Sequence, residues 1–280
     1  MDHLAFDPEG ARLFVAEVAN GSLDVVDTKS GKVTGRIAGL DEPQGVEWLP
    51  EEGEIVVACG DGSVRFYSGA DLRLVASVDL RDDADDVRVD PRNGRVVVGY
   101  GNGGLAMIDP ATHRLTSRVI FHGHPEGFQL SGDRAYVNVP GDGAILELDL
   151  DRSRVLARWP TGLHRLNFPM AIDPSGRTIA IAYRLPAAWA RIEVATGKTV
   201  ALHPACGDAD DIYEAGSREL IVCGAGYVDV WREGSLEARV RTGSGARTGL
   251  YLPALHTLYV AVPDRHGAAA VWALELRDAG

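Results

Sequence analysis

Residues 3–16 read HLAFDPEGARLFVA, a short apolar strand, a turn and a second apolar strand, and this unit decides the fold because it recurs along the chain. Six more units begin at residues 45, 86, 127, 169, 211 and 248, and they read GVEWLPEEGEIVVA, DVRVDPRNGRVVVG, GFQLSGDRAYVNV, PMAIDPSGRTIAIA, DIYEAGSRELIVC and TGLYLPALHTLYVA. Strand-and-turn units repeated about every 40 residues are typical of propeller blades.

Two further strands follow in most units. After a glycine-rich loop comes a third apolar strand, such as SLDVVD (22–27), and then a more polar fourth strand, such as KVTGRI (32–37). Seven units of four strands predict an all-β, seven-bladed β-propeller that forms a single domain over residues 1–280. The expected blades span about 2–40, 41–81, 82–122, 123–163, 164–206, 207–244 and 245–280.

The seventh unit is shorter than the others. Its third strand is expected in AAAVWALEL (268–276), and the tail from Arg277 to Gly280 is too short for a fourth strand. We therefore predict a three-stranded last blade with an open outer edge. An open edge pairs readily with another chain, so self-association through this blade is expected.

Composition and charge limit the partners. The 280 residues carry a formal net charge of −12, and an acidic surface repels phosphate backbones, so nucleic acid is not an expected partner. No apolar stretch is long enough to span a membrane, and no secretory leader begins the chain. We expect a soluble protein, periplasmic or secreted if a leader has been removed and cytoplasmic otherwise.

The three cysteines, Cys59, Cys206 and Cys223, are an odd number without metal-type spacing. They are interpreted as buried free thiols and not as a disulfide framework.

Polar residues gather where the first strands begin. Alternation of strand direction places these positions on one face, together with the loops between second and third strands. A small ligand bound at the mouth of the channel would therefore meet side chains from several blades. The expected ligand-binding residues are His3, Gln44, Asp86, Asn138, Asn167, Arg184, Asp211 and Arg247.

Carboxylates dominate this face in blades three, four and six. Crowded carboxylates repel one another unless a cation or a proton lies between them. A divalent metal ion (Ca, Mg, Mn or Zn) is therefore a candidate cofactor, because oxygen ligands suit the first three and a histidine widens the choice to zinc. The candidate metal ligands are Asp85, Glu126, Asp210 and His124. Aspartates at such positions also commonly bond to main-chain amides, and this structural role is weighed equally.

His124 and Glu126 are also the candidate catalytic pair. A histidine beside carboxylates titrates near neutral pH and can act as a general acid or base. No nucleophile elbow or phosphate-binding glycine loop occurs in the sequence.

Several stretches resemble the bacterial YVTN-type (surface-layer-like) β-propeller repeat proteins. They are DHLAFDPEGARLFVA at the start, DADDVRVDP, GHPEGFQL with YVNVP, LNFPMAIDP with YRLP, DADDIY, and GARTGLYLP near the end. The resemblance covers essentially the whole chain and implies a seven-bladed propeller that is often exported and largely without assigned activity.

Three functions remain open from the sequence. The first is a propeller that binds a small ligand or metal ion at an acidic central site without chemistry. The second is a metal-dependent lyase or hydrolase that uses the same site. The third is a protein-interaction scaffold in which the rim residues are structural.

Overall fold

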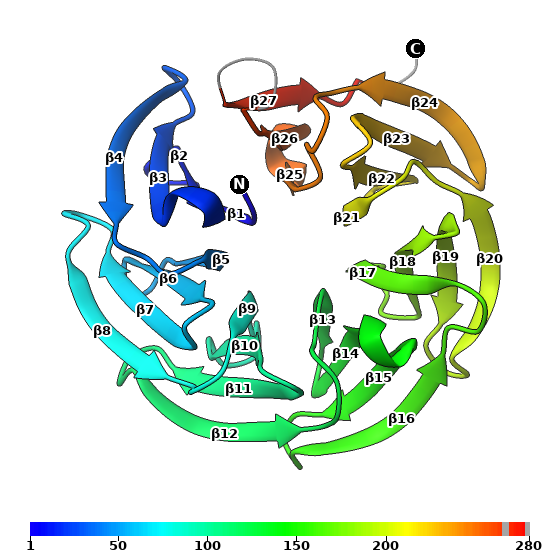
Figure 1. Ribbon diagram of the computed structural model, residues 1–280, viewed down its shortest axis with the longest axis horizontal. Helices are drawn as coiled ribbons and strands as arrows, with labels where there is room; N and C mark the ends of the chain where they lie inside the picture. The colour runs from blue at the N-terminus through cyan, green and yellow to red at the C-terminus, as the bar shows by residue number, and fades with distance from the viewer. Residues whose placement is uncertain (265–268, 278–280) are drawn as a thin grey trace. The chain divides into compact units, whose positions relative to one another are not determined.

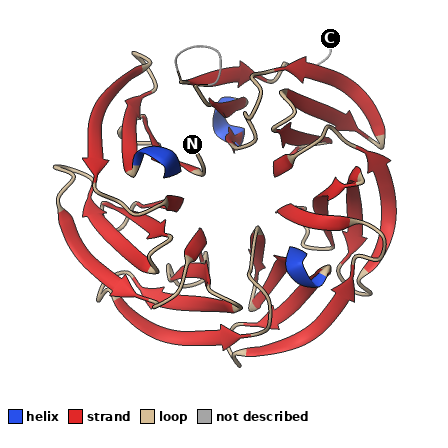
Figure 2. Ribbon diagram, viewed as in Figure 1, coloured by secondary structure: helices blue, strands red, loops and turns tan. Residues whose placement is uncertain are grey.

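The computed structural model describes residues 1–264 and 269–277, and nearly all of them lie in strands or tight turns (Figures 1 and 2). Six antiparallel sheets have four strands and the last sheet has three, as the repeat predicts. The protein is a seven-bladed β-propeller. No helix among the described residues is long and apolar enough to cross a membrane.

Within each blade the strands follow one another in chain order. Blade one holds β1 (Leu4–Asp7), β2 (Arg12–Glu17), β3 (Ser22–Asp27) and β4 (Lys32–Ala38). Blade two holds β5 (Pro43–Leu49), β6 (Glu54–Cys59), β7 (Ser63–Ser68) and β8 (Leu74–Asp79). Blade three holds β9 (Ala84–Val89), β10 (Val96–Tyr100), β11 (Gly104–Asp109) and β12 (Arg114–Ile120). Blade four holds β13 (Phe128–Ser131), β14 (Arg134–Val139), β15 (Ala144–Asp149) and β16 (Arg154–Pro160).

The remaining blades follow the same order. Blade five holds β17 (Arg165–Ile172), β18 (Thr178–Leu185), β19 (Ala187–Glu193) and β20 (Lys198–Pro204). Blade six holds β21 (Ala209–Ala215), β22 (Arg218–Cys223), β23 (Tyr227–Arg232) and β24 (Ser235–Arg241). Blade seven holds β25 (Gly249–Leu252), β26 (Thr257–Val262) and β27 (Ala270–Glu275). Three single-turn 3-10 helices, η1 (Val18–Asn20), η2 (Pro140–Asp142) and η3 (Pro253–Leu255), lie in loops.

In three blades the first strand ends at an Asp-Pro pair: Asp7-Pro8, Asp90-Pro91 and Asp173-Pro174. Oδ1 of Asp7 accepts hydrogen bonds from the amides of Glu9 and Gly10, both at 3.0 Å. Asp90 accepts the amide of Arg92 at 3.0 Å, and Asp173 the amide of Ser175 at 2.7 Å. Proline presets the turn dihedral and the aspartate satisfies the amides that follow, so the same dipeptide reverses the chain in three blades.

The last blade is three-stranded, as predicted. β27 begins at Ala270. The sequence placed the start of this strand at Ala268, which lies outside the described residues.

By contacts the chain divides into two compact units. The first comprises residues 1–125, 132–135 and 148–156, and the second comprises 126–131, 136–147 and 157–280. Each unit buries apolar side chains between successive blades, which removes their surface from water. In the first unit Phe14 of blade one packs in one cluster with Ile55 of blade two. In the second, Trp189 of blade five shares a cluster with Ile221 of blade six.

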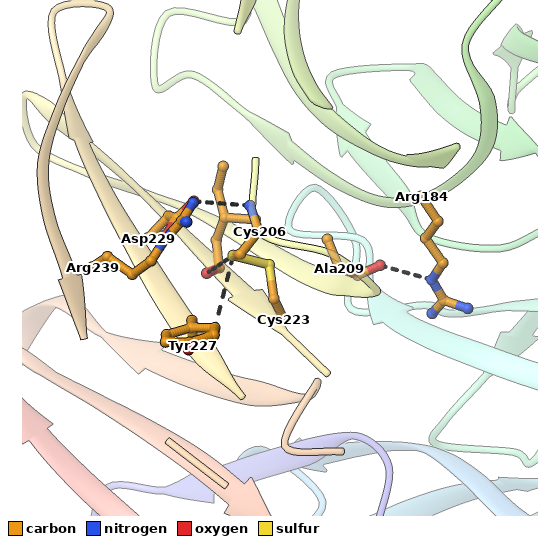
Figure 3. The surroundings of a disulfide bond; sticks show 8 residues. Arg184, Cys206, Ala209, Cys223, Tyr227, Asp229 and Arg239 are labelled. Atoms are coloured by element: carbon orange, nitrogen blue, oxygen red, sulfur yellow. Dashed lines mark hydrogen bonds and ion pairs between the residues drawn. A yellow bond between two sulfur atoms is a disulfide. The ribbon is translucent and has the colours of Figure 1, made fainter. Parts of the chain in front are cut away.

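The prediction for two of the cysteines is wrong. Cys206 and Cys223 form a disulfide with Cα atoms 5.8 Å apart (Figure 3). Cys59 is a buried free thiol, as expected. The residues are 17 apart in sequence, and pairing of β21 with β22 brings Cys223 opposite Ala209, beside the loop that carries Cys206. Only this strand register creates the proximity, so sequence spacing alone did not indicate it.

Candidate functional site

A recurrent bulge lies near the start of several first strands. In β9 the register with β10 jumps from Ala84–Tyr100 to Val87–Val98, so Asp85 and Asp86 both lie opposite Gly99. The register also shifts at the matching place in β5, β17 and β21. A bulge inserts an extra residue and re-aims the side chains beside it. In β9 and β21 the bulge follows a core alanine, Ala84 or Ala209, and is made by aspartates.

In the first unit, Asp85 and His124 are brought together. The Nε2 atom of His124 lies 3.5 Å from Oδ2 of Asp85. The other ring nitrogen, Nδ1, lies 2.8 Å from the carbonyl oxygen of Gly101. A carbonyl oxygen only accepts hydrogen bonds, so Nδ1 carries the proton and donates it. Nε2 therefore faces the carboxylate, as a hydrogen-bond donor when the ring is protonated and with its lone pair when the ring is neutral.

The carboxyl group of Asp85 is buried, and burial raises its pKa. The hydrogen bond with His124 and the positive potential of His3 act in the opposite direction, and the charges of Asp2 and Asp86 add to the increase. A buried carboxylate facing an imidazole lone pair is stabilised by a proton or a cation between the two groups.

Glu126 follows His124 by two residues and is the first residue of the second unit. Its amide donates a hydrogen bond to the carbonyl of Asn138 at 3.0 Å, which fixes the main chain at this position. Asp85, His124 and Glu126 are each able to offer one ligand atom to a metal ion.

A second polar group in the first unit surrounds Asp86. Its Oδ1 accepts the amide of Val87 at 3.0 Å and the guanidinium of Arg88, and Nε2 of His3 lies 4.0 Å from it. Among the described residues no hydrogen bond reaches Oδ2 of Asp86, although the atom is buried. The charges of Asp86 and Arg88 also act on the carboxyl group of Glu47 on β5. Burial raises the pKa of Glu47 to about 7, and the charge of Asp86 adds to the increase while Arg88 opposes it.

Gln44, the predicted ligand contact in blade two, is engaged within the first unit. Its amide donates to Oδ1 of Asp83 at 2.9 Å.

In the second unit, two arginines share two aspartates. The guanidinium of Arg184 pairs with Asp210 and lies 3.3 Å from Asp208, and it stacks 3.7 Å above the ring centre of Phe168. Arg247 approaches Asp208 at 3.5 Å and Asp210 at 3.9 Å. Asp210 thus has cationic partners of its own in this unit.

Three of the predicted ligand contacts have hydrogen-bond partners within the second unit. The amide of Asn138 donates to the carbonyls of Phe168 and Pro169 at 3.1 and 3.0 Å. Asn167 donates to Oδ1 of Asn138 at 2.8 Å, and both side chains are fully buried. Asp211 accepts the amide of Gly249 at 2.7 Å. The contact of Asp211 agrees with the structural role weighed for such aspartates from the sequence.

Reasoning from the sequence missed Glu47, Arg88 and Asp208. Glu47 carried a usable signal, because it is an acidic residue within the otherwise apolar strand GVEWL. Arg88 carried a local signal, because it follows its partner Asp86 by two residues on the same strand. Asp208 carried none, since its role depends on Arg184 and Arg247, which other parts of the chain bring to it.

No family model matches the chain, and no curated protein matches it. Solved structures do match. A chain of Kuenenia stuttgartiensis hydrazine synthase has a TM-score of 0.86 at 17% identity, covering 98% of this chain and 95% of that chain. A chain of a mitotic checkpoint complex has a TM-score of 0.83 at 15% identity, covering 98% of this chain and 87% of that one. At such low identity the likeness shows the propeller fold alone.

Proposed function

We propose that this propeller binds a divalent cation, with Asp85 and His124 as ligands. The observation that carries the proposal is the hydrogen bond from Nδ1 of His124 to the Gly101 carbonyl. Histidines that bind metals generally donate their other ring proton to a carbonyl or carboxylate, which fixes the ring and directs the free nitrogen at the ion.

The spacing of the two donor atoms fits zinc. Zinc bonds of roughly 2.0–2.1 Å to nitrogen and oxygen at a tetrahedral angle place the two donors about 3.4 Å apart. The distance between Nε2 of His124 and Oδ2 of Asp85 is 3.5 Å. An imidazole among the ligands also favours zinc over calcium or magnesium, which prefer oxygen alone.

Zinc titration calorimetry on protein purified without chelator tests this proposal. We expect saturable binding near one ion per chain for the wild type, and loss of that binding in His124→Ala and Asp85→Asn. A matched control is His113→Ala. Nε2 of His113 lies 2.8 Å from Oε2 of Glu54, an ordinary hydrogen bond that leaves no room for an ion, so this variant should bind zinc as the wild type does. Equal zinc binding by His124→Ala would exclude the site.

The same residues could serve catalysis, with His124 and Glu126 exchanging protons with a substrate, and small-ligand binding would use the same mouth. We place cation binding first because the fixed tautomer of His124 supports it without requiring a substrate.

We also propose that the chain is a YVTN-type propeller that works in an oxidising compartment. Structural disulfides persist in the periplasm or outside the cell and are rare in the cytoplasm of most organisms. The Cys206–Cys223 bond therefore favours export over a cytoplasmic location.

A further inference from the structure

The outer edge of blade seven differs from that of the other blades. Within the described residues no strand pairs with the far side of β27. No residue of β27 is buried, whereas each third strand of the other six blades has three to five buried residues under its fourth strand. Trp272, in the middle of β27, is 41% exposed.

The hydrogen-bonding groups of this edge point outward in a known pattern. The amide of Leu276 donates to the carbonyl of His256 at 2.7 Å, and the register of β26 with β27 continues without a shift. Because bonded pairs alternate in an antiparallel ladder, residues 270, 272 and 274 bond to β26. The amides and carbonyls of Val271, Ala273 and Glu275 therefore face away from the blade.

β27 also lacks the features that protect a natural edge. Exposed edge strands usually carry basic residues, prolines or bulges that prevent pairing. Five of the six fourth strands carry Lys or Arg, and bulges interrupt the pairing of β4, β8, β12, β20 and β24 with their third strands. Residues Ala270–Glu275 contain no basic residue, no proline and no bulge. This edge has the character of a strand that is normally covered.

The other blades show what chemistry covers such a strand. In blades one, three and six, the third residue of the third strand lies opposite an arginine. This arginine is the fifth residue of the fourth strand. The pairs are Asp24–Arg36, Ala106–Arg118 and Asp229–Arg239. Two of these arginines also stack on aromatic rings, Arg118 on Tyr100 at 5.6 Å and Arg239 on Tyr227 at 5.7 Å.

Trp272 occupies the same third position in blade seven. Tryptophan is the best aromatic partner for a guanidinium, so an arginine brought opposite it gains a cation–π contact. Next to the arginine, the sixth residue of the fourth strand is apolar and buried in blades one and three, as Ile37 and Val119. An apolar groove beside β27 has Leu220, Val228, Val240, Leu258, Leu274 and Leu276 in its lining. Because side chains alternate along a strand, Trp272 lies on the same side of β27 as Leu274 and Leu276, so the groove can receive the stem of the arginine opposite Trp272.

We propose that the outer edge of β27 binds an extended segment of a partner protein that completes the blade as its fourth strand. The segment is six or seven residues long, runs antiparallel to β27, and carries arginine at its fifth position and isoleucine or valine at its sixth. Strand addition of this kind draws affinity from the main chain and specificity from alternate side chains. A second copy of β27 fits less well, because its own fifth residue is Leu274 and it would place no arginine on Trp272.

A synthetic peptide with the sequence of residues 112–122, which includes the β12 strand RLTSRVI, serves as the probe. We expect saturable one-to-one binding to the full chain by calorimetry. The matching peptide with Arg118→Gln should bind about 2- to 5-fold more weakly, the size of an exposed cation–π contact. In the Trp272→Leu protein the two peptides should bind equally.

Two variants of the protein locate the binding edge. Ala273→Pro removes an outward amide without breaking a bond to β26, and proline is tolerated on such an edge. This variant should lose the peptide, while Ala273→Ser, which keeps the amide, should bind it. Thermal unfolding of both variants shows that the blade is intact.

Three results would overturn the proposal. They are the absence of saturable binding at millimolar peptide, equal binding by Ala273→Pro and wild type, and sedimentation showing a dimer that Ala273→Pro converts to monomer. The last result would show that a second copy covers the edge. None of these outcomes depends on the cation site.

Discussion

Replacing Glu47 with glutamine should change how stability depends on pH. Glu47 has a pKa of about 7 in the folded chain, against 4.5 for an exposed glutamate, chiefly because it is buried. Between these two values the folded state holds a proton that the unfolded state has released. The wild type therefore loses stability as the pH rises from about 4.5 to about 7, and the loss is complete above that range.

The magnitude follows from the two pKa values. Each unit of pKa difference corresponds to about 1.4 kcal/mol, so ionising Glu47 inside the fold costs up to about 3 kcal/mol. Glutamine is uncharged and has the shape of the protonated acid, so Glu47→Gln avoids this cost. We expect the variant to match the wild type at pH 4.5 and to be up to about 3 kcal/mol more stable at pH 8.

Urea unfolding at pH 4.5, 6 and 8 measures this difference. The control is Glu51→Gln, which changes an exposed glutamate in the turn after β5 and should leave the pH dependence unchanged. If Glu47→Gln and wild type lose stability in parallel between pH 4.5 and 8, the carboxyl group is not held protonated by burial and the reasoning fails.

Two further predictions concern stability. Replacing both Cys206 and Cys223 with serine should lower the free energy of unfolding by about 3 kcal/mol, because the disulfide restricts the unfolded chain over a loop of 17 residues. Identical urea unfolding curves for the oxidised wild type and the variant would contradict this. Asn138→Ala should cost about 1–3 kcal/mol, because it leaves the carbonyls of Phe168 and Pro169 and the amide of Asn167 without their buried partner. A change in urea midpoint no larger than that of an exposed substitution such as Ser153→Ala would show that water replaces these bonds.

The repeat in the sequence was sufficient for the fold. Seven strand-and-turn units, the Asp-Pro turns and the short seventh unit predicted seven blades with a three-stranded last blade, and the structure has them. These features are readable because strand periodicity and turn chemistry are local properties of the chain.

The sequence also placed Asp85 and His124 in one group, because Asp85 precedes the first strand of blade three and His124 precedes the first strand of blade four, at the same face. It did not show which ring nitrogen of His124 faces the carboxylate. The Gly101 carbonyl decides that, and a main-chain acceptor has no signature in the sequence.

Only the tertiary structure decided the remaining features. The Cys206–Cys223 bond, the raised pKa of Glu47 and the buried amides of Asn138 and Asn167 all depend on which residues the strand registers and neighbouring blades bring together. Register and packing between blades fix distances across tens of residues of sequence, and both the energy of a buried charge and the formation of a disulfide depend on those distances.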